Sequence, residues 1–403
     1  MGNNSTYKGN VIYIGHIGED GTAMALHTRN IACLLENLGY KVTFVCKNVR
    51  QPEKQYGKLD QFEYHYTNQY LKLPKIRTIE WMIEEVAALK LMRLFKKINS
   101  IKRASFVIFY GYSGEKHIIN YCHRHGIKVV IDRTDWFEPD DSDNAFGRLF
   151  TKFIANKCVE KHDFLADGVI SISRFFENHY KNGGQQTIFI PPLMQNIVLA
   201  QDISPADLPI RLVYAGSLGG NKDSIEPVIE CLINSFNRED VQFKLSLVGI
   251  DERQLNKSFG EHDWRKFGIY AFGKISHTEA ESIVANSDFS FLLRQNKRYA
   301  KAGFSTKFAE SLSMGVPVIC TCVGGADQMI TDMENGVLVQ DNSIQSIQSA
   351  LKKVLTLSEE QRNQMKLEAQ TLAMNAFHPD LYKQTLASFL LQDEKKERKN
   401  DLL

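Results

Sequence analysis

The chain has 403 residues, of which 43% are hydrophobic and 24% are charged, and its formal net charge is +2. This length exceeds what one hydrophobic core usually serves, so we expect two domains of roughly 150 to 200 residues each. The small net charge argues against nucleic-acid binding, and no apolar run approaches the roughly 20 residues of a transmembrane helix.

The N-terminal residues and the cysteines predict a cytoplasmic protein. Residues 1–8 are polar and lack the apolar segment of a secretion signal. The seven cysteines are scattered and form no C-x-x-C pair, so we expect neither a disulfide framework nor a zinc site.

The first half of the chain alternates between strand-like and helix-like segments. An apolar run at 11–15 is followed by helical spacing over 22–38 and a strand over 39–46. Further strands are expected at 106–110, 128–132, 167–173 and 188–190. This alternation is typical of a parallel sheet covered by helices, which places the protein in the α/β class.

Prolines and polar residues between 191 and 209 mark a domain boundary, after which the alternation resumes. Strands are expected at 211–216, 243–249, 269–273, 289–293 and 316–320. We therefore predict a Rossmann-like domain over 9–195, a second over 208–378, and a C-terminal helix with a charged tail over 379–403. In one interpretation that helix crosses back to the N-terminal domain.

The segment 303–319 carries the strongest functional signal. Ser305 and Thr306 form a small-hydroxyl loop, Lys307 opens a helix, and Glu310 lies further into that helix. A helix N-terminus offers unpaired backbone N–H groups and partial positive charge, so this loop suits a diphosphate. Glu310 suits the hydroxyl groups of a sugar.

A second glycine-rich loop, 215–223, follows a predicted strand. Gly216 and Ser217 lie at its start and Lys222 near its end. Alone, Lys222 is most simply a solvated surface lysine, but together with Lys307 it predicts a site for phosphate. Arg294 precedes the Lys307 loop and is either a further cation for that site or the partner of a nearby carboxylate.

A third glycine loop, 15–21, follows the first strand. Gly15 and Gly18 allow a ligand to approach the backbone closely, although a plain strand-to-helix turn explains them equally well. The spacing is G-x-x-G-x-x-G, and Cys46 and Lys47 stand where a dinucleotide site needs an acidic residue. Dinucleotide binding is therefore disfavoured.

These loops resemble those of GT-B glycosyltransferases, specifically the family 4 type of bacterial polysaccharide and glycoconjugate assembly. The resemblance lies in 305–312 with 315–319, in 215–217 with Lys222, and more weakly in 131–136 and 166–173. It implies two Rossmann-like domains facing across a cleft, with a nucleotide sugar on the C-terminal domain and the acceptor on the N-terminal one.

The resemblance also implies an activity. The protein would be a hexosyltransferase that uses a UDP- or GDP-linked sugar, needs no metal or further cofactor, and retains the anomeric configuration. Glu310 would hold the donor ribose, while Lys222 and Lys307 would neutralise the diphosphate leaving group. The acceptor would be a glycan or a lipid-linked glycan.

Asp135 is the candidate on the acceptor side because it follows a strand of the N-terminal domain. It is placed either to orient or deprotonate an acceptor hydroxyl or to cap the next helix. Asp141 and Asp143 imitate a metal-binding DxD motif, but no strand leads directly into them, so we expect no metal there.

The chain departs from the family pattern at two positions. Ala302 stands where the Glu-x7-Glu pattern ending at Glu310 would place its first glutamate, and Ser217 stands where many members have arginine. Two alternatives therefore stay open. One is a non-catalytic glycosyltransferase-like partner subunit, and the other is a nucleotide-sugar epimerase with the same fold.

The segment 71–106 interleaves apolar side chains such as Trp81 and Leu89 with many lysines and arginines. One interpretation is a basic amphipathic face that contacts anionic lipid on the inner side of a membrane. The other is a core helix with a solvated basic side.

Overall fold

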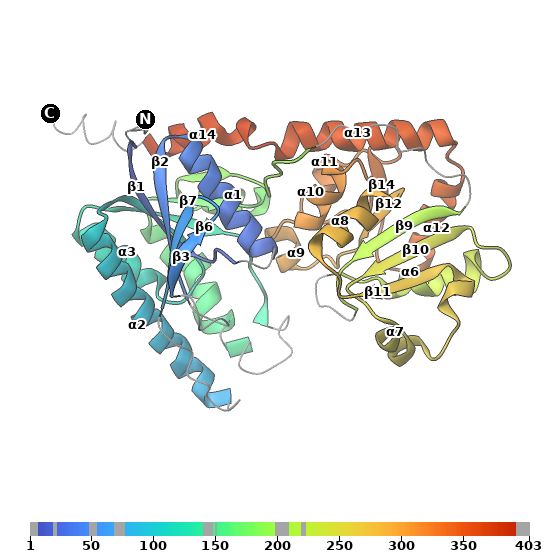
Figure 1. Cartoon of the computed structure of the whole chain (residues 1–403), viewed down its shortest axis with the longest axis horizontal. Helices are drawn as coiled ribbons and strands as arrows, with labels where there is room; N and C mark the ends of the chain where they lie inside the picture. The colour runs from blue at the N-terminus through green and yellow to red at the C-terminus, as the bar shows by residue number, and fades with distance from the viewer. Residues whose placement is uncertain are drawn as a thin grey trace. The chain divides into compact units, whose positions relative to one another are not determined.

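The computed structural model describes residues 7–18, 22–47, 55–67, 77–139, 148–149, 151–197, 209–218 and 223–391, with only the backbone of 77–86 and of residue 327. The chain divides into two compact units (Figure 1), Met1–Leu193 with Pro379–Leu403, and Met194–His378. Lys222 and the Asp141 to Asp143 segment lie outside the described residues.

The N-terminal unit is built on an eight-stranded sheet with the order β3-β4-β2-β1-β5-β6-β7-β8, parallel except for the β3–β4 pair. Its helices and short helical segments pack around this sheet. The elements are β1 (Gly9–Gly15), α1 (Ala23–Asn37), β2 (Tyr40–Cys46), β3 (Tyr56–Leu59), β4 (Phe62–Tyr66), α2 (Arg77–Ile101), β5 (Ala104–Tyr110), α3 (Glu115–Arg124), β6 (Lys128–Arg133), η2 (Thr151–Ala155), η3 (Cys158–His162), η4 (Asp163–Leu165), β7 (Gly168–Ser171), α5 (Arg174–Asn182), β8 (Thr187–Phe189) and α14 (Asp380–Leu391).

The central strands of this unit are buried on both faces. Residues 11–14 of β1 and 106–109 of β5 are all buried, which is the pattern of parallel strands covered by helices on each side. The chain runs from β1 outward to β2 and then crosses to β5 on the other side of β1. A topological switch point therefore lies between β1 and β5, and open α/β sheets bind their ligands at such points.

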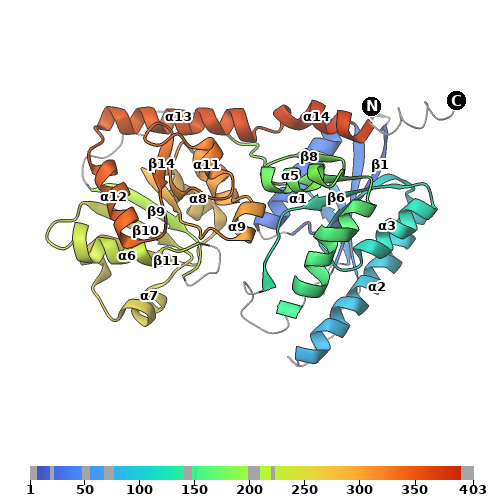
Figure 2. The same cartoon turned by 180° about the vertical axis from the view of Figure 1, so that it is seen from behind.

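The last helix of the chain, α14, packs on the edge of the N-terminal sheet (Figure 2). Leu386 and Phe389 are its buried residues, and Gln186 Nε2 donates a hydrogen bond to the Phe389 carbonyl oxygen. A Cβ atom on Gly168 would lie 2.6 Å from the Phe389 ring. Glycine at this position therefore lets the helix lie close to the sheet.

The C-terminal unit has a six-stranded parallel sheet with the order β11-β10-β9-β12-β13-β14. Here β9 and β12 flank the switch point, because the chain runs from β9 to β10 and β11 and then returns to β12. The elements are β9 (Ile210–Ala215), α6 (Glu226–Cys231), η5 (Leu232–Phe236), β10 (Phe243–Val248), α7 (Glu252–Phe259), η6 (Trp264–Phe267), β11 (Ile269–Gly273), α8 (His277–Ala285), β12 (Phe289–Leu292), α9 (Arg298–Ala302), α10 (Thr306–Ser313), β13 (Val318–Thr321), α11 (Ala326–Met329), β14 (Gly336–Val339), α12 (Ile344–Leu355) and α13 (Glu359–Phe377).

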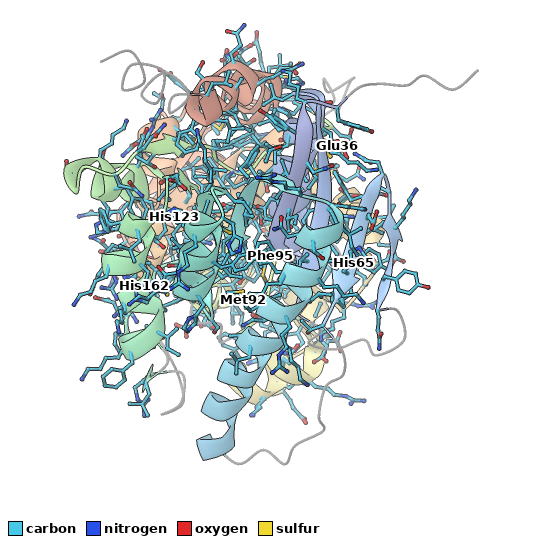
Figure 3. All side chains as sticks on the ribbon, turned by 90° about the vertical axis from the view of Figure 1, so that its left-hand side faces the viewer. Glu36, His65, Met92, Phe95, His123 and His162 are labelled. Carbon is cyan, nitrogen blue, oxygen red and sulfur yellow. The ribbon has the colours of Figure 1, made fainter. Side chains whose placement is uncertain are left out.

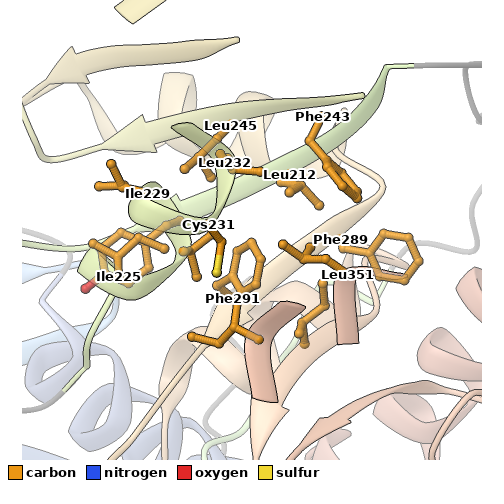
Figure 4. Close-up of a cluster of buried hydrophobic side chains, with 14 of the residues drawn as sticks. Leu212, Ile225, Ile229, Cys231, Leu232, Phe243, Leu245, Phe289, Phe291 and Leu351 are labelled. Atoms are coloured by element: carbon orange, nitrogen blue, oxygen red, sulfur yellow. The ribbon is translucent and has the colours of Figure 1, made fainter. Parts of the chain in front are cut away.

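The core of the C-terminal unit lies between the sheet and the helices α6 and α12 (Figure 4). Leu212 and Phe243 from the sheet meet Ile229 from α6 and Leu351 from α12, and all four are completely buried. Burying a side chain of this size stabilises the fold by about 1.5 to 3 kcal/mol. The sheet edge above this core is thus a rigid support for the loops that follow β9 and β12.

A buried carboxylate links α13 to the same sheet. Asp288, just before β12, accepts hydrogen bonds from Lys366 Nζ on α13 at 2.9 Å and from Arg211 Nη2 on β9 at 2.8 Å. Asp288 and Lys366 are both buried. Removing one partner would leave a buried charge unpaired, which typically costs about 3 to 5 kcal/mol.

The structure adds elements that the pattern of the sequence did not indicate. These are the β3–β4 hairpin, the edge strand β14 and the π-helical segments η2 and η3. The strand expected at 289–293 is β12 (Phe289–Leu292), and Arg294 follows its end. The two parallel sheets and the C-terminal helix agree with the predicted α/β class.

Candidate functional site

The loops that follow β9 and β12 meet at the switch point of the C-terminal sheet. Gly216 and Ser217 come directly after β9, and Arg294 comes after β12. The backbone N–H of Ser224 donates a hydrogen bond to the Leu293 carbonyl oxygen at 2.9 Å, which fastens the first loop to the second. Three of the predicted donor-site residues therefore lie at the sheet edge where α/β folds bind ligands.

The N-terminus of α10 opens at the end of the 303–305 loop. Ser305 occupies the N-cap position, but its side chain makes no capping hydrogen bond, and the first turn has no acidic residue. The helix thus keeps unpaired N–H groups and uncompensated partial positive charge at this end. Such an end suits an anionic ligand.

A carboxylate that the sequence did not single out, Asp223, joins the two predicted cations. Lys307 Nζ donates to Asp223 Oδ2 at 2.8 Å, and Arg294 Nε donates to Asp223 Oδ1 at 3.0 Å. Asp223 is 5% exposed and Lys307 is 37% exposed. Burial raises the pKa of Asp223, but the charges of Lys307 and Arg294 outweigh burial and hold this pKa below its ordinary value.

Two cations on one carboxylate leave a net charge of +1 in this group, which we call the Asp223 cluster (Asp223, Arg294, Lys307). Its more exposed member, Lys307, belongs to the first turn of α10. The positive charge of the cluster and that of the helix N-terminus therefore lie at the same place. Arg294 is the partner of a carboxylate, which was one of its two expected roles, and its role as a cation for a ligand stays a prediction.

Glycines end the two strands beside this cluster, and the backbone requires glycine at position 249. A Cβ atom on Gly216 would lie 2.8 Å from Lys307 Nζ and 2.5 Å from the Tyr214 hydroxyl oxygen. One on Gly249, whose φ is +93°, would lie 2.4 Å from the Gly216 carbonyl oxygen. The two glycines thus give Lys307 room to lie against the loop, with its ammonium 5.2 Å from the centre of the Tyr214 ring.

Glu310 lies one turn further along α10. Its side chain is half-buried, and within the described part of the chain no hydrogen bond reaches its carboxylate. Burial raises the pKa of Glu310, while the charges of His277 and Lys307 oppose that shift. A desolvated carboxylate with free acceptor positions is suited to the hydroxyl groups of a polar ligand.

Ala302, which stands where the family pattern has a glutamate, is completely buried at the end of α9. The loop after β13 packs against α9, since a Cβ on Gly324 would lie 2.2 Å from the Ala300 carbonyl oxygen. A glutamate side chain at position 302 would therefore need a rearranged loop or a buried partner. The methyl group of alanine needs neither.

In the N-terminal unit, Gly15 ends β1, Gly18 follows it with a φ of +39°, and Asp135 follows β6. All three lie beyond the carboxyl ends of parallel strands, hence at the same edge of the sheet. Asp135 is half-buried, and Thr134 Oγ1 donates to its Oδ2 at 3.3 Å while the Tyr112 hydroxyl donates to its backbone carbonyl. The structure thus gives Asp135 a fixed position.

His27, near the first glycine loop, is buried and held by Asp132. Its Nε2 lies 2.9 Å from Asp132 Oδ1, and the Tyr13 hydroxyl donates to the same carboxylate. Burial, with the Asp132 charge and hydrogen bond, raises the pKa of Tyr13 well above its usual value. This buried trio connects β1, α1 and β6 beneath the sheet edge.

Comparison with known proteins agrees with these features. Residues 207–371 match a family model described as glycosyl transferases group 1. A curated relative, an uncharacterised glycosyltransferase from Methanocaldococcus jannaschii, is 22% identical over a match that covers 56% of this chain. The match covers 66% of that relative, so the chain spans slightly less than two thirds of its length.

Solved structures of similar shape cover nearly the whole chain. Sucrose-phosphate synthase from Thermosynechococcus elongatus has a TM-score of 0.72 at 14% identity, over 96% of this chain and 100% of the other. HepE from Anabaena, solved with UDP and glucose, has a TM-score of 0.64 at 14% identity, over 95% and 100%. The fold is therefore that of the GT-B glycosyltransferases, with two Rossmann-like domains.

The residues matched by the family model include the whole Asp223 cluster, the α10 N-terminus and Glu310. In the described part of the chain, no helix has the length and apolar character needed to cross a bilayer.

Proposed function

We propose that the protein transfers a sugar from a nucleotide-diphosphate sugar, bound mainly by the C-terminal domain (208–378), to an acceptor bound by the N-terminal domain (9–195). The observation that carries this proposal is the Asp223 cluster, with its net charge of +1 at an uncapped helix N-terminus. The match of residues 207–371 to glycosyl transferases group 1 supports it.

Each member of the site has a part in this chemistry. The N–H groups of α10, with the Ser305 and Thr306 hydroxyls beside them, bind the diphosphate, and Lys307 and Arg294 neutralise the charge that grows as it leaves. Fixed cations and dipoles of this kind are worth several kcal/mol in a closed site. Gly216 and Ser217 form the β9 side of the site, Lys222 supplies a further cation for the diphosphate, and no metal is needed.

Glu310 receives the hydroxyl groups of the donor ribose in this proposal. Among the residues that the structure describes, none makes a competing hydrogen bond to its carboxylate, and its position one turn into α10 separates it from the diphosphate. Gly15 and Gly18 allow the donor sugar to approach the backbone, and Asp135 orients or deprotonates the acceptor hydroxyl. The configuration at the anomeric carbon is retained.

The donor is UDP- or GDP-linked, and the acceptor is a glycan or a lipid-linked glycan of polysaccharide or glycoconjugate assembly. HepE was solved with UDP and glucose, which favours a hexose on a uridine nucleotide as the first donor to try.

The test is a panel of nucleotide sugars, scored by release of nucleoside diphosphate and by the shift in melting temperature. We expect one donor to be turned over and its nucleotide to raise the melting temperature. Lys301, exposed on α9 just before the site loop, supplies a control, because Lys301→Ala removes a nearby lysine outside the cluster. Binding without turnover would favour the non-catalytic subunit, and interconversion of the donor sugar would favour the epimerase.

We further propose that the protein works in the cytoplasm and contacts the inner face of a membrane through the basic region 71–106. Leu89 on α2 is 57% exposed, and Arg93, Lys96 and Lys97 on the same helix are exposed too. Figure 3 labels Met92 and Phe95 on this helix, and Phe95 is completely buried. Co-sedimentation with lipid vesicles tests this contact. We expect the protein to bind anionic vesicles but not neutral ones, and Leu89→Glu to lose the binding.

A further inference from the structure

A buried group in the N-terminal unit contains two carboxyl groups and one guanidinium. Arg133, at the end of β6, pairs with Asp163 through Nε at 3.0 Å and through Nη2, and Nη2 also donates to Glu115 Oε2. All three side chains are almost completely buried. The guanidinium balances Asp163, so an ionised Glu115 leaves an uncompensated negative charge in the interior.

The second carboxylate oxygen of Glu115, Oε1, is buried in a residue that is 1% exposed. No hydrogen bond reaches Oε1 from the part of the chain that the structure describes. An unmatched buried carboxylate oxygen is costly, and native structures seldom keep one without a reason such as an ion. The oxygen is therefore open to a further ligand.

Two further side chains with metal-binding atoms meet this carboxylate. Cys158 and His162, at the two ends of η3, approach Glu115 at the start of α3, and one ligand atom from each of the three lies within 4.8 Å of the others. Figure 3 labels His162 on η3. The segment is π-helical, a rare form that is found frequently at functional sites.

The spacing of these atoms fits a tetrahedral metal. Cys158 Sγ lies 3.6 Å from His162 Nδ1. Zinc bonds of about 2.3 Å to sulfur and about 2.0 Å to nitrogen, at a tetrahedral angle, separate the two ligand atoms by roughly 3.5 Å. The Cys158 thiol donates a weak hydrogen bond to the Tyr112 carbonyl oxygen at 3.4 Å.

We propose that Glu115, Cys158 and His162 bind one zinc ion through Oε1, Sγ and Nδ1, with water in the fourth position. Thiolate and imidazole ligands favour Zn²⁺ over Mg²⁺ or Ca²⁺. The thiol proton passes to solvent on binding, and the charges of Zn²⁺, the thiolate and Glu115 then sum to zero beside the neutral Arg133–Asp163 pair. Arg133 holds Glu115 Oε2 and so orients the ligand carboxylate. His162 is only half-buried, which gives the ion a route from solvent.

The site can be tested with cobalt in place of zinc. The full chain is first freed of metal with a chelator and then titrated with cobalt, which shows a charge-transfer band when a thiolate is one of its ligands. We expect about one equivalent to bind with that band. Cys158→Ser should abolish the band. His162→Asn removes a ligand itself, so it should weaken cobalt binding by more than the ~100-fold that removing a hydrogen-bond partner of a ligand can cost.

Two variants serve as matched controls. Cys322→Ser removes the exposed cysteine, and His117→Asn removes an exposed histidine on α3 close to Glu115. Both should bind cobalt as the unaltered chain does. A band that survives Cys158→Ser, or binding without a charge-transfer band, would overturn the proposal.

A second measurement needs no variant and so does not depend on the folding of one. X-ray absorption of the zinc-loaded protein should show one sulfur at about 2.3 Å and lighter ligands at about 2.0 to 2.2 Å. A shell that contains no sulfur, or failure to retain zinc after dialysis, would mean that the three side chains form only a structural cluster.

Discussion

The two units of this protein each contain a compact ionic cluster, and the two clusters differ in composition and exposure. In the C-terminal unit, Asp223 lies between Lys307 and Arg294, which leaves one excess positive charge with Lys307 37% exposed. In the N-terminal unit, Arg133 lies between Asp163 and Glu115 with all three side chains buried, and burial together with the Asp163 charge raises the pKa of Glu115 well above its usual value.

This difference separates what each cluster can do. The Asp223 cluster can receive an anion from solvent, because its free charge is positive and accessible. The cluster of Arg133, Asp163 and Glu115 is buried and cannot take up an ion from solvent as readily. Its charges must therefore be balanced by protonation or by a cation held inside. The first is suited to substrate binding and the second to holding β6, α3 and η4 together.

The largest effect should come from breaking the buried cluster. Arg133→Met leaves two buried carboxylates without their cation, so we expect a loss of about 3 to 5 kcal/mol in the free energy of unfolding. Urea denaturation with a chelator present measures it. Arg253→Met on α7 is the control, because Arg253 is exposed and should change stability by less than about 0.5 kcal/mol. Equal losses for the two variants would contradict a stabilising role for Arg133.

The accessible cluster should respond in activity instead of stability. Lys307→Ala removes the cation closest to solvent and should lower kcat by about 100- to 1,000-fold, as loss of one charge-stabilising donor typically does. Stability should fall by less than about 1 kcal/mol because the pair with Asp223 is partly exposed. Turnover equal to that of Lys301→Ala would show that Lys307 does not contact the leaving group.

Asp223→Asn tests whether Asp223 acts by holding the two cations Lys307 and Arg294 in place. The amide keeps the shape but loses the charge that fixes Lys307 and Arg294, so we expect about 1 to 3 kcal/mol of lost stability at neutral pH. The pKa of Asp223 lies below its ordinary value, so this contribution is present above the pKa of the unfolded chain and disappears as the pH falls through the folded-state pKa. Denaturation at neutral and at acidic pH should therefore show the two proteins converging in acid.

Much of the fold could be predicted from the sequence, because parallel strands covered on both faces read as continuous apolar runs. Residues 11–14, 106–109 and 318–321 are such runs, and each is a buried strand. The β3–β4 hairpin was missed because its strands are short and half-polar, with Tyr56 75% exposed. The π-helical η3 was missed because its hydrogen-bond pattern leaves no distinct spacing in the side chains.

Less of the candidate sites than of the fold could be predicted from the sequence. Lys307 and Glu310 were found because one helix start carries both, but Asp223 was not, since its role depends on a contact between residues 84 positions apart. Its one local signal is its place at the end of the 215–223 glycine loop. The expectation of no zinc site rested on the lack of C-x-x-C pairs, and Glu115 joins Cys158 and His162 only through the packing of α3 on η3.

The smallest predicted effect concerns Glu310, and it is a dependence on pH. Burial raises the pKa of Glu310, so acid protonates it at a higher pH than an ordinary glutamate and removes acceptors from the donor ribose. We expect the donor KM of the unaltered protein to rise as the pH falls from neutral through this raised pKa. In Glu310→Gln the KM should be about 3- to 10-fold higher at neutral pH and flat over this range, which corresponds to one neutral hydrogen bond.

The same substitution should not cost stability at neutral pH. A carboxyl group whose pKa is raised in the folded state is stabilising only when protonated, and the folded state loses that advantage as the pH rises through the raised pKa. Glu310→Gln should therefore be as stable as the unaltered protein, or slightly more stable, at neutral pH. Glu281→Gln, which removes an exposed neighbouring carboxylate on α8, should leave the KM near its original value. If the KM of Glu310→Gln instead follows the pH curve of the unaltered protein, the titrating group is another residue and Glu310 does not hold the ribose.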